Sequence, residues 1–207
     1  MTRLEKIKKV IIAGELQNLE FQGLATIMIA EHLYQPLVYV NSDVIDVKPV
    51  SLNEGERNFV MDLREYCLKN KEFFNDKKLY LLRNMSRGRG IGFFEAGNFY
   101  PDFIMWVIAD GEQHINFVDP KGLRNLKGLD DPKILFYKTI KSIEQDLRSQ
   151  DSTITLNSFI ISNTHFPEVE WWNGGMTKER FEERHVLFQK EDKEIYIGKM
   201  LKMSGIL

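Results

Sequence analysis

Two aspartates and a lysine near the middle of the chain have the residue types and spacing needed to hold a divalent cation beside a phosphate. Asp102 follows Pro101, and after sixteen further residues come Asp119, Pro120 and Lys121. Mg²⁺ takes one or two carboxylates and keeps waters and phosphate oxygens as its other ligands. A cation held in this way can ionise a water, while an adjacent ammonium orients that water or stabilises the anionic transition state. This trio of Asp102, Asp119 and Lys121 therefore predicts metal-dependent phosphodiester hydrolysis, with the Pro120 carbonyl as a further ligand.

The trio lies in a stretch, Gly90 to Gly122, that we expect to form three short strands joined by tight turns. Phe103 to Ala109 is apolar and rich in strand formers, which predicts a strand buried on both faces. Asp110-Gly111 is a hairpin signal, and His114 to Val118 is the expected return strand. Because side chains alternate along a strand, the second aspartate and the lysine share a face if that strand continues. The first aspartate then lies at the start of the neighbouring strand.

Asn53 is expected to begin a helix, with Glu56 three residues later as in a capping box. Glu56 lies at helical spacing from Phe59 and Leu63, so it shares their buried face. A carboxylate that points inward needs a partner, and the cap itself is one candidate.

The segments around these elements predict the rest of an α/β sheet. Lys78 to Arg83 is expected to be a strand, and it leads into a loop with Arg87 and Arg89, which either contacts DNA phosphates or is only a solvated turn. A helix is expected from Asp131-Pro132 to about Arg148, followed by a strand from Ile154 to Ile161. A helical crossover of this length permits the strand to run parallel in the same sheet.

The two ends of the chain are less distinctive. Residues 2–13 are expected to form a short helix, and Pro36 to Val40 a strand. Thr177 to Glu183 favours a short helix, while Val186 to Phe188 and Ile195 to Ile197 favour a terminal hairpin.

The P-D and D-P-K motifs, taken with their flanking segments, resemble the PD-(D/E)xK nuclease superfamily. Within it, the chain is similar to the C-terminal endonuclease region of type III restriction enzymes and related DEAD/DEAH-box helicase-nuclease proteins. The segments that carry the similarity are HLYQPLVY (His32 to Tyr39), LNEGERNFVMDL (Leu52 to Leu63), LLRN (Leu81 to Asn84), GFFEAGNFYPDF (Gly92 to Phe103) and FVDPKGLRN (Phe117 to Asn125). The similarity covers residues 30–125 well and the remainder loosely, and Asp119 stands where many members have Glu.

The resemblance implies a restriction-endonuclease-like fold, with an αβββαβ core and a mixed central sheet flanked by helices. It implies a Mg²⁺-dependent DNA endonuclease that hydrolyses phosphodiester bonds, in which Mn²⁺ substitutes for Mg²⁺. The implied metal ligands are Asp102, Asp119 and Pro120, the implied catalytic residues are Asp102, Asp119, Lys121 and Glu56, and the implied DNA contacts are Arg87, Arg89 and Arg124. Glu95 is the alternative to Glu56 at the metal site; otherwise Glu95 is a surface charge and Glu56 only closes its cap.

The resemblance also implies an organisation and a set of partners. Residues 1–50 would link to a helicase region or remain from one, and residues 51–207 would form the nuclease domain. The chain has no GxxxxGK[ST] phosphate loop, so an ATPase motor is expected on a linked helicase domain or subunit, alongside a modification subunit. The expected substrate is double-stranded DNA.

The composition of the chain bounds these expectations. The 207 residues are 43% hydrophobic and 28% charged, as in an ordinary globular protein, but the net charge of −2 is unusual for a DNA-binding domain. Either basic residues gather on one face or another domain supplies the grip on phosphate. The low charge also leaves open a nuclease-fold module that binds DNA or protein without cutting. A single cysteine, Cys67, favours a reducing, cytoplasmic location, and no apolar run approaches the ~18 residues that a membrane span needs.

Overall fold

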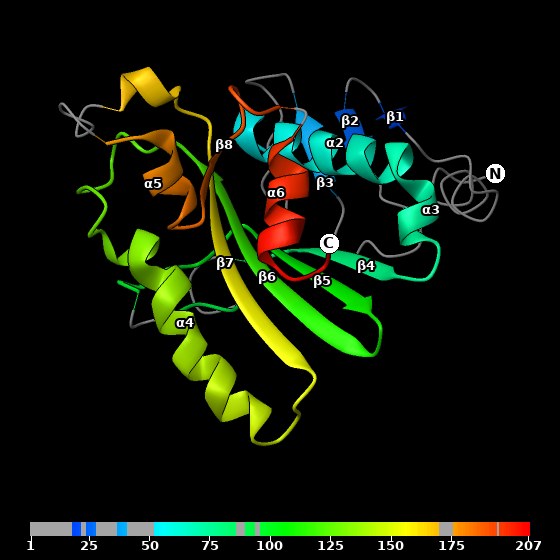
Figure 1. Ribbon diagram of the computed structural model, residues 1–207. Coiled ribbons are helices and arrows are strands. Elements are labelled where there is room, and N and C mark those ends of the chain that lie inside the picture. Colours follow the sequence, from blue (N-terminus) through cyan, green and yellow to red (C-terminus); the bar gives the residue numbers. More distant parts are fainter. Residues whose placement is uncertain are drawn as a thin grey trace.

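The computed structural model describes residues 18–21, 24–27, 37–40, 52–85, 90–93, 96–169, 176–193 and 195–207, with the first three ranges described as strands only. The strands are β1 (Asn18–Phe21), β2 (Leu24–Ile27), β3 (Leu37–Val40), β4 (Lys78–Arg83), β5 (Phe103–Ala109), β6 (Glu112–Lys121), β7 (Ile154–Ser162) and β8 (Val186–Phe188). The helices are α2 (Glu54–Lys69), α3 (Lys71–Phe74), α4 (Pro132–Arg148), α5 (Lys178–Glu182) and α6 (Tyr196–Met203), with a 3₁₀ turn, η2, at Phe166–Glu168 (Figure 1).

Within the described residues, the centre of the fold is a five-stranded mixed sheet in the order β4-β5-β6-β7-β8. β4, β5 and β6 form an antiparallel meander, whereas β7 runs parallel to both β6 and β8. The chain passes from β6 to β7 through α4, which confirms the expected helical crossover between parallel strands. The protein is therefore an α/β fold with helices flanking a mixed sheet.

The two faces of the sheet carry separate cores, which follow the alternation of side chains along each strand. From β5, Phe103 and Met105 join the core that packs under α2 and α6, whereas Ile104 joins the core under α4. From β6, Val118 faces the α2–α6 side and Phe117 faces the α4 side. Both faces are therefore buried around the middle strands, while α4 covers only part of its side.

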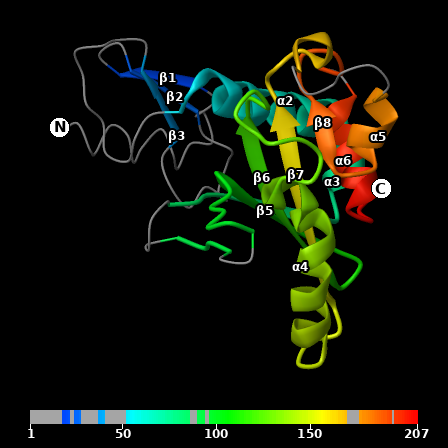
Figure 2. The ribbon, with the colours of Figure 1, turned by 90° about the vertical axis from the view of Figure 1, so that its left-hand side faces the viewer.

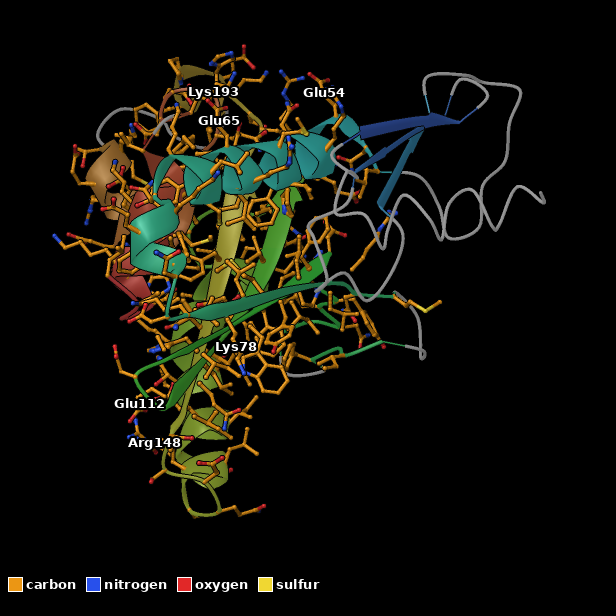
Figure 3. All side chains as sticks on the ribbon, turned by 90° about the vertical axis from the view of Figure 1, so that its right-hand side faces the viewer. Glu54, Glu65, Lys78, Glu112, Arg148 and Lys193 are labelled. Atoms are coloured by element: carbon orange, nitrogen blue, oxygen red, sulfur yellow. The ribbon has the colours of Figure 1, made fainter. Side chains whose placement is uncertain are left out.

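β6 and β7 both run toward the first turn of α2. Their arrowheads point to this helix in Figure 2. Figure 3 shows Glu112, the first residue of β6, at the opposite end of the sheet from Glu54, the first residue of α2. The end of β6 and the start of α2 consequently meet at one edge of the molecule.

β1, β2 and β3 form a separate three-stranded antiparallel sheet, in which β2 is central. β3 confirms the strand expected near Pro36 to Val40. The helix expected over residues 2–13 lies outside the described residues.

Local sequence signals predicted several elements correctly. The capping box of α2 is present: the Asn53 side chain accepts from Glu56 N–H at 3.0 Å, and Glu56 Oε2 accepts from Asn53 N–H at 2.9 Å. Asp131 caps α4 by accepting from Lys133 N–H at 3.0 Å, as the Asp-Pro signal predicts. The Asp110-Gly111 turn is also confirmed, because both residues have the positive φ angles of a tight hairpin turn.

Three predictions were wrong. The stretch from Gly90 to Gly122 contributes two strands rather than three, since Phe93 and Phe99 form only an isolated bridge. β5 is not buried along its whole length, because Trp106 is 40% exposed on the part of the sheet that α4 leaves uncovered. The terminal hairpin is absent: β8 is a parallel edge strand, and the segment from Tyr196 is α6, whose apolar residues recur at helical spacing and pack into the core.

None of the helices in the described part of the chain is long and apolar enough to cross a membrane.

Candidate active site

Asp102 and Asp119 lie side by side where β5 begins and β6 ends. Phe103 is paired with Val118 across these antiparallel strands, so the next step of the same register sets Asp102 opposite Asp119. The Asp102 carbonyl accepts a hydrogen bond of 2.8 Å from the Asn84 backbone N–H, which fixes the start of β5 against the end of β4. Burial aside, the two carboxyl groups lie near enough for the charge of Asp119 to shift the pKa of Asp102 upward. Residues far apart in the sequence thus meet at one sheet edge.

The electrostatics of the pair favour the protonated form of Asp102. Burial and the charge of Asp119 raise the pKa of Asp102 to about 9, with a smaller rise from Glu56 and an opposing effect from Lys121. A carboxyl group with such a pKa is protonated at neutral pH, and in this form it carries a proton that it can donate to a neighbouring carboxylate. The negative charge of Asp119 thus disfavours the ionised form of its neighbour Asp102.

Lys121 supplies a positive charge at the same edge. It lies two residues beyond Asp119 on β6, therefore on the same face, and its Nζ forms an ion pair with Asp119 Oδ2. That oxygen is buried and receives no well-directed hydrogen bond from any residue in the described ranges. Lys121 Nζ also stands 5.1 Å from the centre of the Phe99 ring, which borders the site on the α4 side. Asp119 thus retains a buried oxygen that is not fully satisfied.

Glu56 reaches the edge of the site from α2, and it also closes the cap of that helix. Its Oε2 accepts from Asn53 N–H at 2.9 Å and pairs with Arg83 Nη2 at 3.3 Å. Burial raises the pKa of Glu56, the Asn53 hydrogen bond and Arg83 oppose the rise, and Asp119 adds to it. The two roles considered for Glu56 are therefore compatible, because a capping carboxylate also contributes charge to the aspartate pair.

Arg83 is a site neighbour that the sequence analysis did not single out. It is the last residue of β4, it is paired with Phe103, and its side chain is only 11% exposed. The available signal in the sequence was a positively charged residue at the end of the expected strand that precedes the P-D motif. Its location beside Glu56 keeps that carboxylate oriented toward the end of the sheet.

The remaining predicted site residues lie in different surroundings. Pro120 is buried within β6, and its side chain projects to the opposite face from its two neighbours, as strand alternation requires. Arg124 is exposed and forms an ion pair of 2.9 Å with Glu168. Arg87, Arg89 and Glu95 lie outside the described residues.

The donor set at the sheet edge fits a hard divalent cation. Asp102 and Asp119 provide carboxylate oxygens, one of them incompletely satisfied, and a cation would replace the proton on Asp102. No group of three or more His, Cys, Asp and Glu side chains in the described ranges is arranged to hold a metal ion.

Comparison of the chain with protein-family models, with curated proteins and with solved structures finds no match in any of the three.

Proposed function

We propose that the protein is a Mg²⁺-dependent DNA endonuclease whose active centre is formed by Asp102, Asp119 and Lys121. The observation that carries the proposal is the convergence of three residues at one sheet edge: Asp102 lies opposite Asp119 across β5 and β6, and the Lys121 ammonium forms an ion pair with Asp119. Paired carboxylates beside a lysine suit a phosphate substrate, because the acidic pair can hold a cation and the ammonium attracts an anion.

Each residue of the trio would have a distinct task. Asp102 and Asp119 would hold the cation, which when bound acidifies a water and offsets charge on the phosphate. Lys121 would leave its ion pair with Asp119 to contact the attacking water or a phosphate oxygen, which places its charge where negative charge develops. Glu56, held by Arg83, would keep further negative charge at the edge and favour the metal-bound state of the pair.

The order of elements supports the same proposal. α2, β4, β5, β6, α4 and β7 follow one another as helix, three strands, helix and strand, apart from the short α3. This is the αβββαβ order that the resemblance to PD-(D/E)xK nucleases implies. We propose a restriction-endonuclease-like topology on this basis, and a linked helicase remains a prediction of the same resemblance.

The proposal is tested by DNA cleavage with the purified chain. In Mg²⁺ or Mn²⁺, the wild-type chain is expected to nick supercoiled plasmid, and Asp119→Asn and Lys121→Ala are each expected to lower the rate by about 10²-fold or more, as for the loss of one electrostatic stabiliser of a transition state. The matched controls are Asp110→Asn, in the hairpin turn after β5, and Lys138→Ala, an exposed residue of α4. Both controls should cut like the wild type.

Calorimetry with Mn²⁺ separates the two parts of the proposal. Asp102→Asn and Asp119→Asn should abolish Mn²⁺ binding, whereas Lys121→Ala should keep it or strengthen it, because the lysine competes with the cation for Asp119. A wild-type chain that binds DNA but neither binds Mn²⁺ nor cuts would contradict the nuclease and favour a module that only binds.

A further inference from the structure

A polar cavity opens directly beside Lys121. Its volume is about 560 Å³, and its walls come from the first turns of α2 and α4, the loop after β6, the loop after β7 and the residues after β8. The residues that contribute charge or amide groups are Glu54, Asn58, Lys121, Arg124, Asn125, Lys133, Asn163, Glu168, Gln189 and Lys190. Lys121 belongs both to this wall and to the candidate active site, so the cavity adjoins that site.

The charges around the cavity favour an anion. Arg124 is neutralised by Glu168, and Lys121 is paired with Asp119. Lys133 and Lys190 form no ion pair with any residue that the structure describes, and they therefore contribute uncompensated positive charge.

Two helices add to this potential. α2 and α4, of 16 and 17 residues, both present their first turns to the cavity. The N-terminal end of a helix carries a partial positive charge and favours negative ligands. Glu54 and Glu56 oppose this field at the start of α2, and the Asp131 cap opposes it at the start of α4. The uncompensated positive charge therefore comes mainly from Lys133 and Lys190.

The cavity also presents groups that can pair with nucleic-acid bases. Asn58 and Asn163 line it, and in the described part of the chain neither side chain has a hydrogen-bond partner. Carboxamides donate and accept hydrogen bonds at once, which suits the mixed donors and acceptors of base edges. Gly55 lets α2 approach Asn163 closely, since a Cβ at position 55 would stand 2.8 Å from Asn163 Nδ2. This contact holds the asparagine at the cavity wall.

We propose that the cavity binds a single nucleic-acid strand beside the cleavage position, with Lys133 and Lys190 on its phosphates and Asn58 and Asn163 facing its bases. The inference rests on the proposed function and deepens it, because it assigns a path to the strand that leaves the candidate active site. A volume of about 560 Å³ falls in the range of about 300–1,000 Å³ that takes a small molecule, which is the scale of one or two nucleotides. A duplex carries a paired second strand and is too bulky for a cavity of this volume.

The test measures binding separately from cleavage. Fluorescence anisotropy in EDTA would compare a short labelled single-stranded DNA with the blunt duplex of the same sequence, on the wild-type chain and the Lys133→Ala/Lys190→Ala variant. We expect the variant to lose at least tenfold in affinity for the single strand. Its plot of log affinity against log salt should flatten by about 1.4, since each lost phosphate contact on a single strand removes about 0.7 from the slope.

The matched control is Lys138→Ala/Lys202→Ala, which removes the same charge from exposed positions of α4 and α6 outside the cavity. It should bind like the wild type. Asn58→Ala/Asn163→Ala should weaken single-strand binding while the salt slope stays unchanged, because it removes base contacts and no phosphate contact.

The outcomes distinguish this inference from the proposed function. Equal losses in the Lys133/Lys190 variant and its control, a loss for the duplex alone, or no binding of single strands by the wild type would overturn the cavity assignment, even if plasmid is cut in Mg²⁺. Loss of single-strand binding confined to the cavity variants supports the assignment, even if the wild-type chain does not cut.

Discussion

At the scale of the residue, the aspartate pair lowers the stability of the folded protein, and the same pair gives the protein its capacity to bind a cation. Asp102 is protonated in the folded protein at pH values where it is ionised in the unfolded chain, because burial and Asp119 raise its pKa from 3.8 to about 9. Between these two values the folded state holds a proton that the unfolded state releases. The contribution of this group to stability therefore falls as pH rises through that window.

This linkage predicts that Asp102→Asn stabilises the metal-free protein at high pH. The amide is uncharged at every pH, so the free energy of unfolding of the variant should exceed that of the wild type at pH 8, with the gain shrinking toward pH 4. Urea unfolding in EDTA across this range measures the difference. Asp110→Asn, at an exposed turn, should show no such trend. A gain that is constant with pH would contradict the raised pKa of Asp102.

At the scale of the element, α2 connects the candidate site to the core: its first turn carries Glu56, and its apolar face packs on the sheet. Its capping box involves the same Glu56 oxygen that pairs with Arg83, so the end of the helix and the charge beside the aspartates are set together. Asn53→Ala should lower the free energy of unfolding by about 1 kcal/mol, as for the loss of an N-cap side chain.

Urea unfolding again provides the measurement for this variant. Asn58→Ala, one turn further along α2 and without a side-chain hydrogen bond to any described residue, is the control and should stay within about 0.5 kcal/mol of the wild type. If the two variants are equally stable, the capping box contributes nothing.

The elements also show what the sequence can predict. α2 and α4 were predictable because their caps depend on side chains within four residues of the helix start, Asn53 with Glu56 and Asp131 with Pro132. The Asp102 and Asp119 pairing followed from strand alternation and one hairpin. α6 was missed because Ile195 to Ile197 is too short an apolar run to distinguish strand from helix, although Met200 and Leu201 continue the helical spacing. The cavity was not predictable, because five segments distant in sequence build it.

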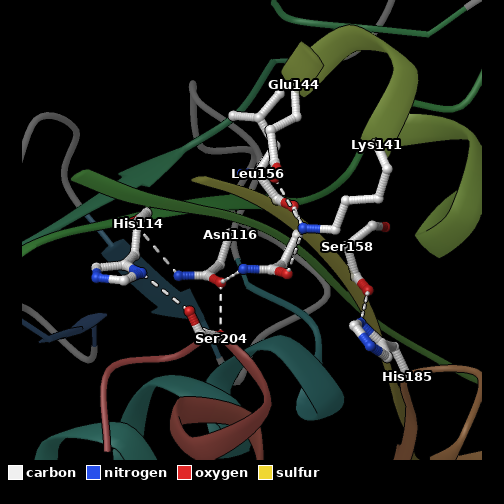
Figure 4. Close-up of polar contacts among 9 residues, drawn as sticks. His114, Asn116, Lys141, Glu144, Leu156, Ser158, His185 and Ser204 are labelled. Carbon is white, nitrogen blue, oxygen red and sulfur yellow. Dashed lines mark hydrogen bonds and ion pairs between the residues drawn. The ribbon is translucent and has the colours of Figure 1, made fainter. Parts of the chain in front are cut away.

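At the scale of the whole molecule, a polar network joins the helices on the two faces of the sheet (Figure 4). On the α4 side, Lys141 Nζ donates to Glu144 Oε2 at 2.8 Å, to the Leu156 carbonyl at 2.6 Å and to Asn157 Oδ1 at 3.2 Å. Asn157 Nδ2 then donates to Asn116 Oδ1 at 3.3 Å. The network thus reaches the centre of β6 from α4.

The same Asn116 oxygen accepts from Ser204 Oγ, just after α6, at 2.7 Å. His114 Nδ1 lies 2.9 Å from the Ser204 carbonyl, and because a carbonyl only accepts, this nitrogen carries the proton. These bonds fix the end of α6 to β6. Leaving a polar group unpaired in a core costs more free energy than its hydrogen bond contributes when made. Each residue of the network therefore depends on its partners being present.

The network predicts that Asn157 and Ser204 are energetically coupled although they lie on opposite sides of Asn116. Asn157→Ala and Ser204→Ala each remove one donor to the same oxygen, and the second loss leaves that oxygen unpaired in the interior. A double-mutant cycle by urea unfolding should therefore give an interaction energy of at least about 0.5 kcal/mol. Ser204→Ala combined with Thr139→Ala, an exposed position of α4, should be additive. Additivity in the first cycle would mean that the two helix layers are held by their separate apolar cores alone, and that the polar network between them contributes no energetic coupling.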